Sequence, residues 1–335
     1  MENFATCWEG LEDPRTGNAT LHDFHDLLKI GLCTVLSGGE NATDMAEFTK
    51  AKEPFLREFL RLPNGIPSHD TFSRLFRLLD PEKFGAAFQR FMKAFSEQCQ
   101  GVVAIDGKVL RRSHHRAKGK SALHMVSAWG CEQRMVLGQI ATVAKSNEIT
   151  AVPKLLALLS LVNTIVTADA LNCQRAIARQ IVDQGGDYAL ALKNNQPALH
   201  ADVELFMNDP VTRAGAAVAR TFDGDHGRIE TRTGIVIADI EGIQALHRWP
   251  GLAAIGMVTR ERETPGKTTR ETAYYLLSTA LTSERFLEVV HLHWCVENQL
   301  HWRLDVVMNE DQQRNRADNG LNNRKRPVSH AVSLA

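Results

Sequence analysis

The sequence predicts a mixed α/β fold, in which a sheet with flanking helices follows an N-terminal helical domain and carries a β-rich insertion. Three observations support this class. Apolar side chains recur at helical spacing over residues 21–95, and short apolar runs alternate with helical segments over residues 102–192. Strand-like runs separated by Gly- and Pro-containing loops then fill residues 197–282. A chain of 335 residues can bury a full core, so we expect one large or two smaller domains.

The first part of the chain, residues 1–98, is predicted to form the helical domain. Phenylalanines recur at helical spacing near its end, at Phe84, Phe88, Phe91 and Phe95. Before them, residues 65–71 turn at Gly-Ile-Pro and offer Ser68, Asp70 or Thr71 as the N-cap of another helix.

Residues 99–320 are predicted to form the sheet domain. Strands are expected at residues 102–105, 121–129, 135–143, 164–168 and 188–192, and helices at residues 148–161 and 173–184. The insertion, at about residues 197–282, has a short helix at residues 199–206 and strands at residues 228–240, 253–260 and 272–278. A long helix without Gly or Pro then runs from residue 283 to about residue 307.

Net charge excludes no partner, because 39 Lys and Arg residues balance 39 Asp and Glu residues. The six cysteines are scattered without a C-x-x-C pair, so we expect reduced thiols in a cytoplasmic protein. The N-terminus lacks the basic and then apolar pattern of a secretory signal. The longest apolar stretch, residues 152–166, is too short to span a bilayer, so no membrane partner is expected.

Two acids follow apolar runs at predicted strand ends. Asp106 comes after Val-Val-Ala-Ile, and Asp169 comes after residues 164–168. Ligands collect at strand ends of such sheets, so the two carboxylates can share a cleft and suit Mg²⁺ or Mn²⁺. We also expect Gly107 to let another backbone or a substrate approach closely. The alternative is that each acid is a helix N-cap or an ordinary loop residue.

The predicted helix at residues 283–307 carries polar side chains at a spacing of four, at His293, Glu297, His301 and Asp305. Such a line on an apolar helix indicates either a lined cleft or a salt-bridged interface, and spacing does not separate the two. A zinc site at His293 and His301 is a weaker alternative, because helical zinc ligands are normally four residues apart. We interpret Trp294 and Trp302 as core anchors, with base-stacking platforms as the alternative.

Basic side chains cluster in two places. Residues 111–120 follow Asp106 closely and contain Arg111, Arg112 and Arg116 without any acid, which favours contact with phosphates over a plain charged hairpin. A second cluster, at residues 314–326, fits a solvated tail equally well. Lys193 and Asn194 end a predicted strand and form either a phosphate contact or a simple turn.

Several of these blocks resemble the DDE transposases of bacterial insertion sequences, specifically the ISAs-type, H-repeat-associated group of the IS4-like superfamily. The resemblance covers nearly the whole chain. It is carried by Asp13-Pro14-Arg15, Gly65-Ile66-Pro67-Ser68-His69-Asp70-Thr71, Ala104-Ile105-Asp106-Gly107-Lys108, Thr167-Ala168-Asp169-Ala170, Ala191-Leu192-Lys193-Asn194-Asn195-Gln196, His226-Gly227-Arg228-Ile229-Glu230 and the block from His293 to Val306.

The resemblance implies a ribonuclease H-like sheet domain with the β-rich insertion before its last catalytic helix. It implies that Asp106, Asp169 and Glu297 hold two Mg²⁺ ions, with Mn²⁺ as a substitute; the residues alone did not choose Glu297 over Asp305. Two metal ions of this kind activate a water or 3′-hydroxyl for in-line attack on a phosphodiester. The candidate DNA contacts are Lys108, Arg111, Arg112, Arg116, Lys193, Asn194, His226, Arg228, His293, His301 and Arg303.

The implied function is cleavage and strand transfer at the ends of an insertion sequence, in the bacterial cytoplasm and at the nucleoid. The implied partners are the terminal inverted repeats of the element, target DNA and a second copy of the protein. Residues 321–335 depart from the family pattern, and we interpret them as a frameshifted or truncated tail. The alternatives are an inactive DNA-binding remnant and a general metal-dependent nuclease.

Overall fold

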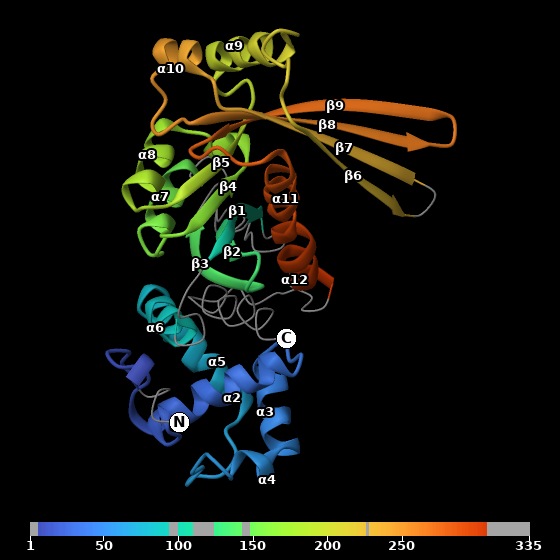
Figure 1. Cartoon of the computed structure of the whole chain (residues 1–335). Coiled ribbons are helices and arrows are strands. Elements are labelled where there is room, and N and C mark those ends of the chain that lie inside the picture. Colours follow the sequence, from blue (N-terminus) through green and yellow to red (C-terminus); the bar gives the residue numbers. More distant parts are fainter. Residues whose placement is uncertain (1–5, 94–99, 110–123, 143–147, 226–227, 307–335) are drawn as a thin grey trace, which may run out of the picture.

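The computed structural model describes residues 6–93, 100–109, 124–142, 148–225 and 228–306. Helices gather at the N-terminal end of the molecule, and a long twisted sheet with helices on both faces forms the rest (Figure 1). The predicted boundary at residues 98 and 99 and the predicted tail at residues 321–335 both lie outside the described residues.

The N-terminal part is helical, as its periodicity predicts. Its elements are η1 (Gly17–Thr20), α2 (Phe24–Leu36), α3 (Ala42–Ala51), α4 (Glu53–Leu56), α5 (His69–Leu78) and α6 (Pro81–Lys93). Trp8 is buried against α6, with its ring 5.5 Å from Phe84 and 5.7 Å from Phe88 between centroids. Ser68 occupies the N-cap position of α5.

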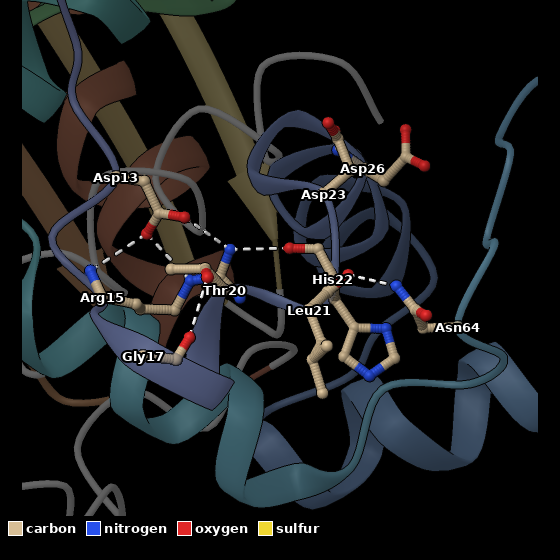
Figure 2. A network of polar contacts seen from close by, with 9 residues as sticks. All are labelled: Asp13, Arg15, Gly17, Thr20, Leu21, His22, Asp23, Asp26 and Asn64. Atoms are coloured by element: carbon tan, nitrogen blue, oxygen red, sulfur yellow. Dashed lines mark hydrogen bonds and ion pairs between the residues drawn. The ribbon is translucent and has the colours of Figure 1, made fainter.

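The Asp13-Pro14-Arg15 block holds the chain at the entry to α2 (Figure 2). Buried Arg15 donates from Nε and Nη2 to the two carboxylate oxygens of Asp13, at 2.8 and 2.7 Å, and also from Nη2 to the carbonyl of His22 at 2.8 Å. The next residue, Asp23, caps α2 by accepting from the backbone N–H of Asp26 at 2.9 Å. The block is therefore a structural clamp on the helical part.

A nine-stranded sheet is present within the described residues, in the order β3-β2-β1-β4-β5-β9-β8-β7-β6. Its strands are β1 (Gly101–Val109), β2 (His124–Gly130), β3 (Met135–Thr142), β4 (Thr164–Ala168), β5 (Asp187–Leu192), β6 (Val218–Asp225), β7 (Arg228–Ile237), β8 (Ala254–Thr264) and β9 (Lys267–Leu277). The β1–β4 and β4–β5 pairs are parallel, and the other pairs are antiparallel. This mixed sheet with flanking helices confirms the predicted mixed α/β class.

The two faces of the sheet bury different helices. Val103 and Ile105 of β1 pack in the core with α7 (Glu148–Leu156) and α8 (Arg175–Asp183). Val102 and Ala104 pack in the core with α11 (Ser283–His293). Because successive side chains of a strand alternate in direction, Asp106 belongs to the α11 face and Gly107 to the α7 face.

The insertion extends the sheet instead of forming a separate unit, since β9 pairs with β5. Strands β6 to β9 project beyond the helices as an arm (Figure 1). The arm end of β8 and β9 is exposed. The sequence did not predict β6 or α10 (Glu241–His247), and α9 (Pro197–Asn208) is longer than predicted. Helix α7 ends five residues earlier than the predicted residue 161, at Leu156.

The five described cysteines, Cys7, Cys33, Cys131, Cys173 and Cys295, are free thiols. Among the described helices none has both the length and the apolar character needed to cross a membrane.

Close packing of α11 on the sheet gives a first prediction. A Cβ added at Gly256 of β8 would overlap the ring of Phe286 on α11. Gly256→Ala should therefore destabilise the fold by about 1–3 kcal/mol through overpacking, measured by urea unfolding. Gly224→Ala on β6, where an added Cβ meets no atom within 4 Å, is the matched control. Equal stability of the two variants would contradict this packing.

Candidate active site

Asp106 lies within a strand and not at its end, which corrects the sequence prediction. Strand β1 continues to Val109 because its pairing with β2 runs to Val109↔His124. The parallel pairing with β4, however, ends at Ile105↔Ala168. Asp106 is therefore the first residue of β1 beyond β4, at the point where the two strands no longer share a ladder and a side chain can reach a cleft.

Asp169 directly follows β4, as predicted. Its Oδ1 accepts hydrogen bonds from the backbone N–H and the Nδ2 of Asn172, at 3.2 and 3.0 Å. It is thus the N-cap of the short helix η4 (Ala170–Asn172), which is the alternative role that the sequence allows. The two descriptions are compatible, because Asp169 also lines the cleft described below.

The predicted helix over residues 283–307 is interrupted, which is a second correction. Helix α11 ends at His293, a π-helical turn spans Val296–His301, and α12 covers Trp302–Val306. The N–H of Trp302 bonds to the carbonyl of Glu297, five residues earlier. In an α-helix, residues four positions apart are offset by about 40° around the helix axis. The wider π turn offsets that drift and keeps the polar line directed at the sheet.

All four residues of that line face the sheet side of the helix. His293 Nδ1 lies 3.0 Å from Thr167 Oγ1 on β4, and His301 Nδ1 lies 3.4 Å from Asp106 Oδ2. Glu297, between them, lines the cleft with Asp106 and Asp169. Asp305 instead accepts from Lys108 Nζ at 2.5 Å, which ties α12 to β1. The structure therefore places Glu297, and not Asp305, with the two strand acids.

The three acids line a cleft of about 780 Å³ between the strands and the helix that carries Glu297. Basic and polar side chains share its wall, namely Lys193, Asn194, His200, Arg260 and His293. Trp294 also lines it and is 38% exposed, with the guanidinium of Arg260 5.5 Å from its ring centroid. Trp302 is 55% exposed, so the prediction that both tryptophans anchor the core is wrong.

Negative charge is crowded around Asp106. Burial raises the pKa of Asp106 from 3.8 to about 7; the backbone N–H of Gly107 offsets part of this, and the charges of Glu297, Glu148 and Asp169 add to it. Burial also lowers the pKa of His293 and of His301 to about 4, with Lys108 and His124 assisting at His301. Both histidines are therefore neutral at pH 7 and supply no positive charge that would stabilise the neighbouring carboxylates.

A divalent cation fits this donor set, because carboxylate oxygens are the ligands that Mg²⁺ and Mn²⁺ prefer and the cation relieves the repulsion between them. Among the described side chains, no three His, Cys, Asp or Glu residues are close enough together to form a complete metal site. The three acids thus line the same cleft, but their side chains are not gathered closely enough to form a complete set of metal ligands. The zinc alternative gains no support, since His293 and His301 contact different strands.

The predicted DNA contacts differ in where the structure places them. Lys193, Asn194 and His293 line the cleft, whereas Lys108 pairs with Asp305 and His301 lies 3.4 Å from Asp106. Arg111, Arg112, Arg116 and His226 fall outside the described residues. Arg228 and Arg303 are described in their backbone, within β7 and α12, and not in their side chains.

The sequence prediction missed the arginines of the arm. Buried Glu230 of β7 binds Arg232, Arg260 and Arg262, with contacts of 2.6, 3.2 and 3.1 Å. Burial alone raises the pKa of Glu230, but the Arg262 hydrogen bond and the Arg232 and Arg260 charges bring it below its ordinary value. The pattern Arg260-Glu261-Arg262 within a strand was the available signal, because it places both arginines on one face.

Family membership follows from the chain as a whole. Residues 97–324 match the family described as Transposase DDE domain, and residues 5–92 match the family described as DDE_Tnp_1-associated. The chain belongs to the DDE transposases. Its relatives place it in the IS4-like group of these transposases.

Two relatives and one solved structure illustrate the similarity. This DDE transposase is 46% identical over 283 residues to an uncharacterized protein in the dhlA 3′ region of Xanthobacter autotrophicus, covering 83% of this chain and 95% of that protein. It is 39% identical over 305 residues to the H repeat-associated putative transposase YhhI of Escherichia coli K12, covering 87% and 79%. A piggyBac transposase synaptic complex with hairpin DNA, solved by cryo-EM, aligns with a TM-score of 0.41 and 14% identity, covering 99% of this chain and 71% of that chain.

The raised pKa of Asp106 gives a second prediction, for metal-free protein. Because the folded protein holds the Asp106 proton more tightly than the unfolded chain does, the contribution of Asp106 to wild-type stability falls as the pH rises from 3.8 to about 7. Asp106→Asn removes this loss. It should raise the free energy of unfolding above pH 7 by at most about 4 kcal/mol, at about 1.36 kcal/mol for each pH unit between those values.

Urea unfolding in EDTA between pH 4 and pH 8 measures this difference. Asp239→Asn, the same change at an exposed aspartate, is the control. A difference between wild type and Asp106→Asn that does not grow with pH would contradict the raised pKa of Asp106.

Proposed function

We propose that this transposase cleaves and joins DNA at the ends of an insertion sequence, using two Mg²⁺ ions held by Asp106, Asp169 and Glu297. The observation that carries the proposal is that these three acids, from β1, the end of β4 and the π turn, line one cleft in a chain of the DDE family. Two rigid strands and a packed helix present them, which suits a site that must hold its geometry during reaction.

Bound Mg²⁺ supplies the Lewis acidity that activates a water or a 3′-hydroxyl and stabilises the leaving oxygen of the phosphodiester. The chain's own contribution is to hold the acids together and to orient the DNA. Neutral His293 and His301 can donate or accept hydrogen bonds beside the acids without adding positive charge that would compete with the cation.

Basic side chains around the acids support DNA as the substrate. Lys193 and Arg260 line the cleft. Arg260 also lies on the same face of the arm as Arg232 and Arg262, since all three contact Glu230. Phosphate binding by Lys and Arg supplies most of the affinity for nucleic acid. The ends of the element and target DNA are the partners that we propose, with a second copy of the protein to pair the two ends.

The acid triad is tested with purified protein, Mg²⁺ and DNA that carries the ends of the element. Glu297→Gln and Asp106→Asn should lower nicking by more than about 100-fold, beyond the 10- to 100-fold loss typical of residues that only support a metal ligand. DNA binding in a gel-shift assay should persist. Glu288→Gln, an exposed acid on α11, is the matched control and should retain activity.

Each alternative has its own outcome in this assay. Cutting of DNA without preference for the ends would identify a general nuclease. End binding by the wild-type protein without cleavage in Mn²⁺ would identify an inactive remnant. Wild-type activity in Asp106→Asn or Glu297→Gln would reject the proposed triad.

Cleft basicity gives a further prediction about affinity. Lys193→Ala should weaken binding of element DNA and lower the slope of log affinity against log salt by about 1, because one phosphate contact is lost. Lys154→Ala, an exposed lysine on α7 at the opposite face of the sheet, should leave both quantities unchanged. An unchanged salt slope for Lys193→Ala would show that this lysine does not contact phosphate.

A further inference from the structure

A buried polar cluster lies behind the acids, on the α7 face of the sheet. Glu148, the first residue of α7, is 2% exposed. Its Oε2 lies 3.1 Å from His124 Nε2 on β2, and its Oε1 accepts a hydrogen bond from Asn172 Nδ2 at 3.0 Å. His124 and Asn172 are as buried as Glu148. Both oxygens of a carboxylate withdrawn from water are therefore engaged by side chains from two other elements.

Asn172 connects this cluster to Asp169. The same Nδ2 that contacts Glu148 also lies 3.0 Å from Asp169 Oδ1, and the backbone N–H of Asn172 lies 3.2 Å from that oxygen. A side-chain amide held at one end by Glu148 thus fixes one oxygen of Asp169 at the other end. Without Glu148, the Asn172 amide would lose the partner that sets its orientation.

The cluster also packs under the backbone beside Asp106. A Cβ added at Gly107 would overlap His124 Nε2 and lie 2.8 Å from Glu148 Oε2. At Gly107 the close approach predicted for a backbone or a substrate is made instead by this buried pair of side chains. His124 and Glu148 therefore pack against β1 from the α7 face of the sheet, at the residue that follows Asp106. No larger residue fits at position 107 unless these two side chains move.

Glu148 is placed to act on the acids without touching substrate. It stands on the face opposite α11, and it is not among the residues that line the cleft. A buried carboxylate is costly unless it is fully paired, so its retention here calls for a role. Hydrogen-bonded partners behind metal-binding carboxylates commonly set ligand orientation and thereby metal affinity.

We propose that Glu148, together with His124 and Asn172, is a positioning network that holds Asp169 and the β1 backbone at Asp106 in the orientation that binds divalent cations. This inference rests on the proposed metal-dependent function. Glu148 acts through Asn172 on one acid and through the backbone of Gly107 on the other, so its loss disturbs two metal ligands at once.

Mn²⁺ binding to the DNA-free full-length protein tests the network, with free Mn²⁺ followed by electron paramagnetic resonance. Glu148→Ala should weaken Mn²⁺ affinity by about 10- to 100-fold. The concentration of metal required for half-maximal nicking should rise by a similar factor, while the rate at saturating Mn²⁺ largely recovers. Glu148→Gln should stay nearer to wild type, because its amide can accept from Asn172 and donate to the other tautomer of His124.

Tyr188→Phe is the matched control, since it removes a buried hydrogen bond to the carbonyl of Pro250 on the same face of the sheet. It should leave Mn²⁺ affinity unchanged. If Glu148→Ala does not fold, Asn172→Ala decides, because it cuts the link to Asp169 and leaves the pair of Glu148 with His124 in place.

The outcomes separate this inference from the proposed function. Wild-type affinity in folded Glu148→Ala or Asn172→Ala, or an equal loss in Tyr188→Phe, would overturn the positioning network while leaving the triad in place. If the wild-type protein binds Mn²⁺ no better than Asp106→Asn does, the metal site itself is rejected, and the positioning network is rejected as well because it depends on that site.

Discussion

Burial of the Asp106 carboxylate in a cleft that other acids share is the constraint on which the site depends. Burial raises its pKa to about 7, and the charges of Glu297, Glu148 and Asp169 add to that effect. Such an arrangement persists only when the surrounding structure imposes it. The sheet restricts Asp106, the π turn restricts Glu297, and the side chain of Asn172 restricts Asp169.

The restrictions come from different parts of the chain. Asp106 is fixed because β1 is paired with β2 on both sides of it, from Val103 to Val109. Glu297 is fixed because α11 packs tightly on the sheet and the π turn redirects the helix that follows, with Lys108 and Asp305 joining its end to β1. Asp169 is fixed by Asn172, behind which Glu148 is buried. Stability is thereby traded for the proposed cation site.

Much of this arrangement was predictable from the sequence because it depends on local patterns. The helical part, the mixed sheet and the position of Asp169 after β4 follow from apolar periodicity and strand length. The end of β1 was not predictable, because the last residues of this strand pair with β2, which begins only at His124. The choice of Glu297 over Asp305 needed either the family resemblance or the structure, because both occupy the same helical line and one of them is bound to Lys108.

The supporting residues were not predictable at all, for a physical reason. Glu148 follows Asn147 as an ordinary first-turn acid of a helix, and its partners His124 and Asn172 are each 24 residues away. Contacts of this kind become visible only when the sheet brings the elements together. The π turn is similarly invisible, because residues 283–307 contain neither Gly nor Pro to mark it.

Anomalous diffraction from crystals of the protein grown with Mn²⁺ locates any bound metal directly. We expect manganese peaks within coordination distance of the carboxylates of Asp106, Asp169 and Glu297. Peaks elsewhere in the cleft that leave any of these three acids unbound, or an absence of manganese at saturating concentration, would contradict this expectation.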